Sequence, residues 1–412
     1  MTRRFLLALA ALAVVSNCQG CFGCETPVDK PGSTLPTDCN ATEPLIEPQK
    51  LDILFVIDNS GSMKEEQEAV ARELTAFIDQ IKQAGGVRQD FHIGVVTTSV
   101  YQHSTQNGVE WFLPYPKQAG RLRPVPNFLP DGGVEYETDN ERILVGDDPE
   151  VVAKFQKLVQ QGTYGSGQET PWEAVRLALT GALATMPADA GGNGGFLRDR
   201  ARLLVTVVSD EDDCSEMVRP SLVKVSDDPA VNECSKQSNL LTSVSEYHRI
   251  LNEEIVNSDG TRKEVIYAAI APVGIDTKAA QEIVEDGKVK NIDCPTSNQG
   301  GMRERQMAEM FDPTLANLDS ICKASFRDTL IAIAELASVS QYLEVRNVPD
   351  ERILQINITR QDGSIQPCTL SNQGIIGYRA GVDGGPALIH FGNQCRRRAD
   401  DQALQVGLLC VN

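Results

Sequence analysis

The chain has 412 residues, of which 41% are hydrophobic, and this length is sufficient for two globular domains. Its formal net charge is −19, which argues against nucleic acid or an anionic lipid surface as a partner through bulk electrostatics. Beyond the N-terminal segment, no apolar run in the sequence is long enough to cross a membrane.

The N-terminal segment predicts export. Two arginines precede an apolar run over residues 5–15, which is too short to span a bilayer and is typical of a signal peptide covering residues 1–17. The sequence Ser16-Asn17-Cys18 resembles the cleavage box of bacterial lipoproteins, which implies lipidation of Cys18. A plain secretory signal is the alternative. We therefore expect an exported protein of the cell envelope, either anchored in a membrane by its lipid or secreted.

The cysteines also indicate an oxidising compartment. The chain has eleven, and if Cys18 carries a lipid, an even number remains that can pair completely. Cys21 and Cys24 form a C-x-x-C pair, but no second pair or nearby histidine completes a zinc site. We expect Cys214 and Cys234 to close a polar insertion. The candidates for disulfides are Cys214, Cys234, Cys294, Cys322, Cys368, Cys395 and Cys410.

The first chemical motif follows a predicted buried strand. Residues 18–50 combine the anchor with a spacer rich in Pro, Thr and Asp. Residues 53–57 are then uninterruptedly apolar, which favours a parallel strand covered on both faces. Directly after this run, Asp58, Ser60 and Ser62 supply a carboxylate and two hydroxyls at alternate positions. Ligands in open α/β sheets bind at this end of the strands.

The segment Asp58-Asn59-Ser60-Gly61-Ser62-Met63 resembles the D-x-S-x-S motif of von Willebrand factor A domains, a family that includes the inserted domains of integrins. The resemblance implies a metal-ion-dependent adhesion site, with one coordination position open for a carboxylate of a partner. It implies Mg²⁺ first, with Ca²⁺ and Mn²⁺ as alternatives. A simple helix N-cap before Glu65 and Glu66 is the competing interpretation.

The next elements extend this pattern. Apolar residues at helical spacing predict a helix over residues 65–83, and a buried strand is expected at residues 91–98. Residues 99–148 are irregular and rich in Pro and Gly, so we expect a long loop. Its aromatic residues either anchor the loop to its own domain or form a contact surface. These aromatic residues are Trp111, Tyr115 and Tyr136.

A second segment resembles another metal loop of the A-domain family. It precedes a helix expected over residues 173–184. Glu169 stands at the spacing that is usual for the family's threonine ligand, whereas Thr170 has the usual residue type. Both therefore remain candidates for one ligand position.

A third segment resembles the last metal loop of that family. Residues 203–208 predict a buried strand, and Asp210 follows its end, so the resemblance makes Asp210 a metal ligand. Glu211, Asp212 and Asp213 are interpreted as a solvated acidic loop, which is the usual role of a run of like charges.

Alternating strands and helices define the fold class. A helix is expected at residues 243–255, a strand at 265–271 and a last long helix at 326–337. The span 51–340 therefore predicts an α/β fold with a doubly wound, mostly parallel sheet, Rossmann-like as in an A domain. Beyond it the spacing changes to a period of two, which predicts a small antiparallel β module over residues 341–412, supported by disulfides.

These patterns favour an adhesion or binding protein whose metal holds a protein or glycan partner through a carboxylate. The expected ligands are Asp58, Ser60, Ser62, Asp210 and either Glu169 or Thr170. One alternative is a structural envelope lipoprotein with a decayed or purely structural metal site. A metal-dependent hydrolase is less favoured, because the sequence has no G-x-S-x-G or phosphate-loop motif. We expect no catalytic residues.

Overall fold

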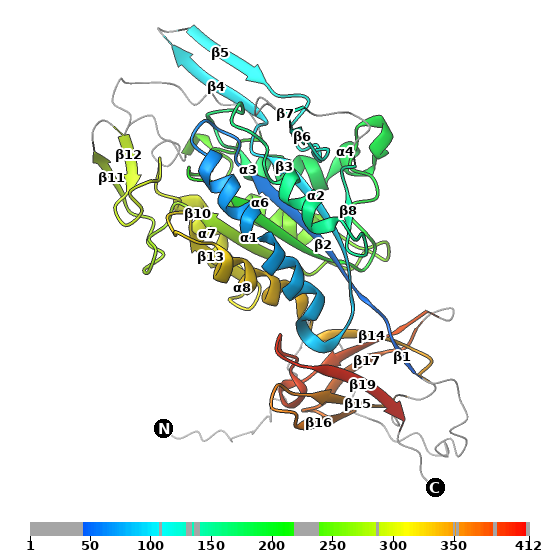
Figure 1. Ribbon diagram of the computed structural model, residues 1–412. Coiled ribbons are helices and arrows are strands. Elements are labelled where there is room, and N and C mark those ends of the chain that lie inside the picture. The colour runs from blue at the N-terminus through cyan, green and yellow to red at the C-terminus, as the bar shows by residue number, and fades with distance from the viewer. Residues whose placement is uncertain are drawn as a thin grey trace, which may run out of the picture. The chain divides into compact units, whose positions relative to one another are not determined.

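The computed structural model describes residues 44–106, 109–128, 134–135, 141–217, 239–285, 288–348, 351, 354–381 and 385–408, all within one compact unit. These residues form a six-stranded sheet with helices on both faces and several small antiparallel sheets (Figure 1). The expected signal peptide and Cys18 lie outside the described residues, as do Cys21 and Cys24. None of the helices in the described part is long and apolar enough to span a membrane.

The central sheet has the strand order β13-β10-β9-β2-β3-β8. Strand β2 (Gln49–Ile57) lies in its middle and pairs in parallel with β3 (Gln89–Thr97) and β9 (Arg202–Val208). Strands β10 (Val265–Ala271) and β13 (Ala316–Ser320) continue the parallel arrangement. Only the short edge strand β8 (Leu144–Val145) is antiparallel. The prediction of a mostly parallel α/β sheet is thus confirmed.

Two apolar layers cover this sheet. One contains α1 (Lys64–Gln83), α2 (Val151–Leu158) and α8 (Arg327–Ser338), and Phe55 of β2 packs edge-on against Phe77 and Phe155 there. The opposite layer contains α3 (Pro171–Leu179), α6 (Val244–Arg249) and α7 (Met302–Met310). Because β2 is covered on both faces, its apolar run is continuous and not alternating.

The helix expected over residues 173–184 is interrupted. Helix α3 ends at Leu179, Thr180 is extended, and α4 (Gly181–Thr185) begins with a glycine at φ 67°. This left-handed backbone conformation is accessible to glycine and ends the first helix. The helix expected over 243–255 also differs, because α6 passes into a π-helical turn at Ile250–Glu254.

The expectation of an irregular loop over residues 99–148 is partly wrong. Strands β4 (Tyr101–Gln106) and β5 (Val109–Pro114) form an antiparallel hairpin, and β6 (Asn127–Phe128) pairs with β7 (Val134–Glu135). Cross-strand pairing stabilises these short segments, although the mostly polar β4 and the two-residue strands β6 and β7 carry little strand signal in the sequence.

The C-terminal residues form antiparallel sheets, as predicted. One has the order β1-β14-β18-β17, and the other β16-β15-β19. Their strands are β1 (Leu45–Ile46), β14 (Tyr342–Arg346), β15 (Leu354–Thr359), β16 (Ile365–Thr369), β17 (Ile375–Arg379), β18 (Ala387–Phe391) and β19 (Ala403–Leu408). Because β1 pairs with β14, part of the segment expected to be a spacer through residue 50 is strand.

Two disulfides join described cysteines. Cys294 pairs with Cys322 and Cys368 pairs with Cys395, with Cα–Cα distances of 5.4 and 5.9 Å. Cys214 is also disulfide-bonded. Its predicted partner Cys234 lies outside the described residues, as does Cys410, so that pairing remains a prediction.

Candidate metal centre

The carboxyl ends of β2 and β9 bring the first and third motifs together. The backbone N–H of Asp58 donates to the Val208 carbonyl at 2.9 Å, which continues the pairing of the two strands. The hydroxyl of Ser209 donates to Asp58 Oδ2 at 2.7 Å, and the Ser60 N–H donates to Asp58 Oδ1 at 2.8 Å. Both oxygens of this buried carboxylate are therefore oriented by the strand ends.

The two serines connect Asp58 with Asp210. Ser62 Oγ donates to Asp210 Oδ1 at 3.1 Å, and Ser60 Oγ lies 3.3 Å from Ser62 Oγ. The sequence places these residues about 150 positions apart, and the parallel pairing of β2 with β9 brings them into contact. The oxygen atoms of the predicted first and third loops thus form one cluster.

The second predicted loop lies next to this cluster. The N–H of Gly165 donates to the Asn59 carbonyl at 2.7 Å, which ties the loop to the first motif. Thr170 donates through both its N–H (3.1 Å) and its hydroxyl (2.7 Å) to the carbonyl of Thr98. Glu169 is fully buried, and neither of its carboxylate oxygens has a hydrogen-bond partner among the described residues.

Like charges crowd this centre. Burial, followed by repulsion from Glu211, raises the pKa of Asp58 to about 7. Burial, followed by repulsion from Asp58, raises the pKa of Asp210 to about 8. The pKa of Glu169 is raised well above its ordinary value by burial and by Glu211. A divalent cation is the group that would relieve this repulsion and occupy the free oxygens.

The donor set fits a hard cation, because all its members are carboxylate or hydroxyl oxygens. Within the described ranges, no group of three or more His, Cys, Asp or Glu side chains already has the geometry of a formed metal site. Binding an ion therefore requires the carboxylates to move closer together.

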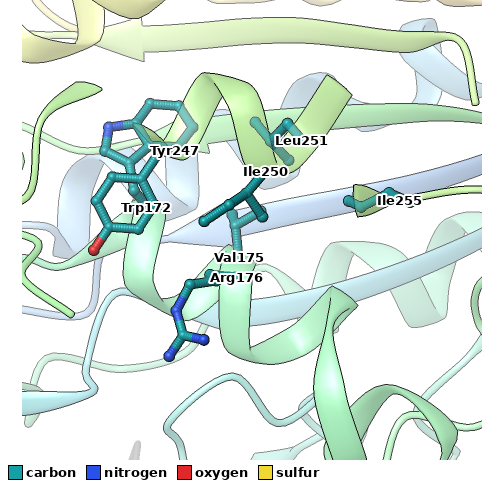
Figure 2. Close-up of a pocket in the computed structure, with 7 residues that line it drawn as sticks. All are labelled: Trp172, Val175, Arg176, Tyr247, Ile250, Leu251 and Ile255. Carbon is teal, nitrogen blue, oxygen red and sulfur yellow. The ribbon is translucent and has the colours of Figure 1, made fainter. Parts of the chain in front are cut away.

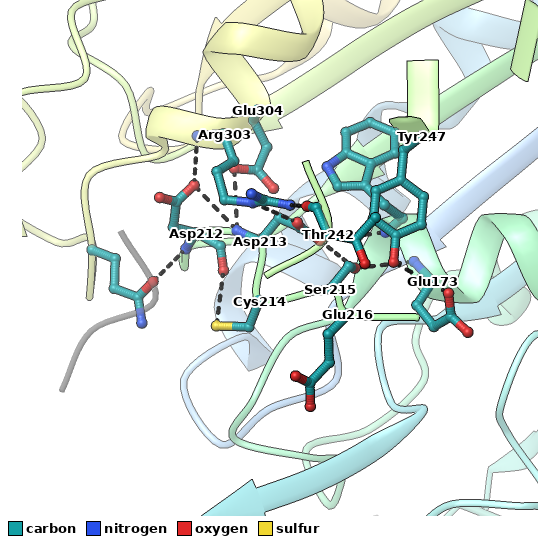
Figure 3. Close-up of polar contacts among 12 residues, drawn as sticks. Glu173, Asp212, Asp213, Cys214, Ser215, Glu216, Thr242, Tyr247, Arg303 and Glu304 are labelled. Carbon is teal, nitrogen blue, oxygen red and sulfur yellow. Dashed lines mark hydrogen bonds and ion pairs between the residues drawn. The ribbon is translucent and has the colours of Figure 1, made fainter. Parts of the chain in front are cut away.

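The interpretation of residues 211–213 as a solvated acidic loop is wrong for two of them. Asp212 and Asp213 are completely buried. Arg303 donates from Nε to Asp213 Oδ2 at 2.8 Å and from its backbone N–H to Asp212 Oδ1 at 2.8 Å (Figure 3). The first turn of α7 thus supplies the counter-charge. Sequence reasoning missed Arg303 because it lies some 90 residues away.

The same polar network continues between α3 and α6. Ser215 donates to Asp213 and accepts a hydrogen bond from the Glu173 N–H at 3.0 Å (Figure 3). The hydroxyl of Tyr247 donates to Glu173 Oε2 at 3.2 Å. These contacts fix the acidic loop after β9 against the helical layer, so they stabilise the loop that carries Asp210.

A shallow crevice beside this network is not a ligand site. Its walls come mainly from apolar side chains of α3, α6 and the turn after α6 (Figure 2). They leave no room even for a water molecule. The lining residues are Trp172, Val175, Arg176, Tyr247, Ile250, Leu251 and Ile255.

The loop that contains Cys294 and Asn298 contacts the third motif. Asn298 follows Cys294, and its side-chain amide donates to Asp210 Oδ2 at 2.6 Å. The neighbouring Gln299 accepts from the Asp212 N–H at 2.8 Å. The sequence marks this loop only as a cysteine-flanked insertion, so it gave no reason to associate Asn298 with the site.

The sequence matches no family model and no curated protein. Similar solved structures include a von Willebrand factor type A protein from Catenulispora acidiphila, at 10% identity and TM-score 0.35, over 87% of this chain and 57% of that chain. The pilus adhesin SpaC of Lactobacillus rhamnosus GG is similar at 9% identity and TM-score 0.33, over 88% and 38%. Manganese-loaded TRAP of Plasmodium vivax is similar at 9% identity and TM-score 0.30, over 89% and 95%.

The chain thus spans about half or less of the first two of these structures, 57% and 38% of their lengths. Its structural neighbours include von Willebrand factor A proteins and pilus adhesins at low identity. Likeness at these TM-scores transfers no function to this chain.

Proposed function

We propose that this protein is an exported adhesion or binding protein that holds a protein or glycan partner through a divalent metal ion. Its ligands are Asp58, Ser60, Ser62, Asp210 and either Glu169 or Thr170. The motifs alone imply Mg²⁺. In this proposal residues 51–340 form the binding domain and residues 341–412 an appended module.

One observation carries the proposal: hydrogen bonds already join the oxygen ligands of separate motifs. Ser62 bridges from the loop after β2 to Asp210 after β9 at 3.1 Å. The cluster lies at the carboxyl ends of parallel strands, where ligands bind in open α/β folds. A bound divalent ion would supply an electrophilic position for a partner's oxygen. The protein's side chains hold the ion and determine which coordination position stays open for the partner.

The proposal is tested by thermal melting of the purified protein with and without Mg²⁺, Mn²⁺ and Ca²⁺. An ion at about 100 times its dissociation constant stabilises the folded state by about 2.7 kcal/mol. We expect this gain for the wild type and its loss in Asp58→Ala. Asp79→Ala, an exposed position on α1, is the matched control and should respond like the wild type. An equal response from all three proteins would place the ion elsewhere.

Binding is measured next, with immobilised glycans and extracellular-matrix proteins, in the presence of the ion and of EDTA. Capture that requires both the ion and Asp58 supports the adhesion role. Ion-dependent stability without any ion-dependent capture would support a purely structural metal site instead.

We also propose that Cys18 carries a lipid. The support is the sequence alone, because this segment lies outside the described residues. Labelling with a clickable fatty acid should be lost in Cys18→Ser, and persistent labelling in that variant would exclude Cys18 as the lipid-bearing residue.

A further inference from the structure

We infer that the metal centre is a calcium site, in which Glu169 and Glu211 act as ligands beyond those of the three motifs. The inference rests on the proposed function, because it concerns the same centre. It names the ion and enlarges the set of side chains that hold it.

The buried environment of the Glu169 carboxylate is that of a metal ligand. Its side chain is 0% exposed, and both carboxylate oxygens lack a hydrogen-bond partner among the described residues. Its backbone is fixed, because its carbonyl accepts from the Cys214 N–H at 2.8 Å. Burial of a carboxylate without a donor is strongly unfavourable, so this side chain requires a proton or a cation.

Glu211 lies in the same centre through a shared serine. Ser209 Oγ donates to Asp58 Oδ2 at 2.7 Å and accepts from the Glu211 N–H at 3.1 Å. This hydroxyl therefore holds the backbone N–H of Glu211 near the carboxylate of Asp58. Within the described residues, Gln299 Nε2 donates to Glu211 Oε2 at a long 3.5 Å.

Glu169 and Glu211 are both held against the acidic loop after β9. The Glu169 carbonyl accepts from the Cys214 N–H at 2.8 Å, and the Glu211 N–H donates to Ser209 Oγ at 3.1 Å. Two ionised carboxylates only accept hydrogen bonds, so neither can satisfy the other. A cation between them satisfies both at once and draws them toward the ligands of the first and third motifs.

The number and type of these oxygens favour calcium. Ca²⁺ takes six to eight oxygen ligands in flexible geometry, and carboxylates can bind it through one or both oxygens. Mg²⁺ requires near-ideal octahedral geometry, keeps several waters and usually binds one or two carboxylates. An ion here would draw together four carboxylates and two serine hydroxyls, which are more protein oxygens than Mg²⁺ usually takes. These groups are the side chains of Asp58, Asp210, Glu169, Glu211, Ser60 and Ser62.

Calorimetric titration of the ion-free protein with CaCl₂ and MgCl₂ tests the inference. We expect Ca²⁺ to bind at least about tenfold more tightly than Mg²⁺. Glu169→Gln and Glu211→Gln should each lower calcium affinity on the order of ten- to a hundredfold and magnesium affinity much less. Glu68→Gln, an exposed position on α1, is the control and should leave both affinities unchanged.

The outcomes separate this inference from the proposed function. Two results would overturn the calcium inference: the wild type binds Mg²⁺ as tightly as Ca²⁺, or both glutamine variants keep the wild-type calcium affinity. If Asp58→Ala abolishes ion binding in the same experiments, the proposed metal site still stands. If Asp58→Ala binds ions like the wild type, the proposed site itself is wrong. Circular dichroism checks folding, and Glu169→Asp serves as a second variant, which keeps the charge but shortens the reach and should also weaken Ca²⁺.

Discussion

Asn298 and Asp210 are joined twice: the side-chain amide of Asn298 donates to Asp210 Oδ2 at 2.6 Å, and its backbone N–H donates to the Asp210 carbonyl at 3.0 Å. Because Ser62 donates to the other carboxylate oxygen at 3.1 Å, both oxygens of Asp210 are oriented. The Asn298 loop is itself fixed by the Cys294–Cys322 disulfide. An insertion outside the three motifs thus positions a residue of the candidate site.

Asn298→Ala should therefore weaken ion binding without unfolding the protein. Loss of a group that orients a metal ligand typically lowers affinity on the order of ten- to a hundredfold. The disulfide and the backbone bond to Asp210 remain in the variant. Ion titration measures the effect, and Asn252→Ala is the control because that side chain donates to the His248 carbonyl within its own helix. Equal affinities in the two variants would show that Asn298 does not position Asp210.

The stability of the ion-free protein should fall as pH rises from about 4 to about 8. Asp58 and Asp210 have ordinary pKa values of 3.8, raised in the folded protein to about 7 and about 8. In this window the folded protein binds more protons than the unfolded chain, so the free energy of unfolding decreases with pH. Ion affinity should rise over the same window, because the ion competes with those protons.

Melting temperatures in EDTA across this pH window measure the effect. Asp58→Asn, which cannot titrate, should show a weaker decrease. A melting temperature of the wild type that stays constant or rises toward pH 8 would contradict the raised pKa values. Calorimetry in buffers of different ionisation enthalpy should also detect proton release on ion binding near pH 7.

The sequence predicts strands β2, β3, β9 and β10 of the central sheet because each contains a short apolar run, whereas the largely polar β13 was not predicted. Strands β2 and β9 and the positions of Asp58 and Asp210 after them follow from that pattern alone. The burial of Asp212 and Asp213 could not be predicted from the sequence. Their counter-charge is Arg303 of α7, which lies some 90 residues further along the chain. The role of Asn298 was hidden for the same reason, since only the folded insertion places it beside Asp210.

The ion pair between Arg303 and Asp213 should be important for stability. Both residues are buried, with the Arg303 Nε 2.8 Å from Asp213 Oδ2. Arg303→Ala would leave a buried carboxylate without its cation, which typically costs about 3–5 kcal/mol of unfolding free energy. Arg305, on the same helix, pairs with Glu309 at 2.7 Å in an exposed position, so Arg305→Ala should cost about 1 kcal/mol or less. Urea unfolding compares the two variants, and a similar loss in both would refute the importance of the buried pair.

Two glycines of the loop before α3 should respond differently to the same substitution. A Cβ at Gly165 would lie 2.3 Å from Asn59 Oδ1 and 2.6 Å from Ser99 Oγ, closer than real Cβ contacts allow. These side chains cannot easily move aside, because Ser99 donates to Asn59 at 2.8 Å and accepts from the Ser166 N–H at 2.8 Å. At Gly167 the nearest atom would be Gln102 Nε2 at 3.7 Å, which is ordinary contact.

Gly165→Ala should therefore destabilise the protein by about 1–3 kcal/mol, as other overpacked sites do. It should also weaken ion binding, because it displaces Asn59, which lies between the ligands Asp58 and Ser60. Gly167→Ala should be neutral or stabilising by up to about 1 kcal/mol, since alanine restricts the unfolded chain without a clash in the folded one. Urea unfolding and ion titration of both variants check this. If Gly165→Ala keeps wild-type stability and affinity, the contact between this loop and the first motif does not shape the site.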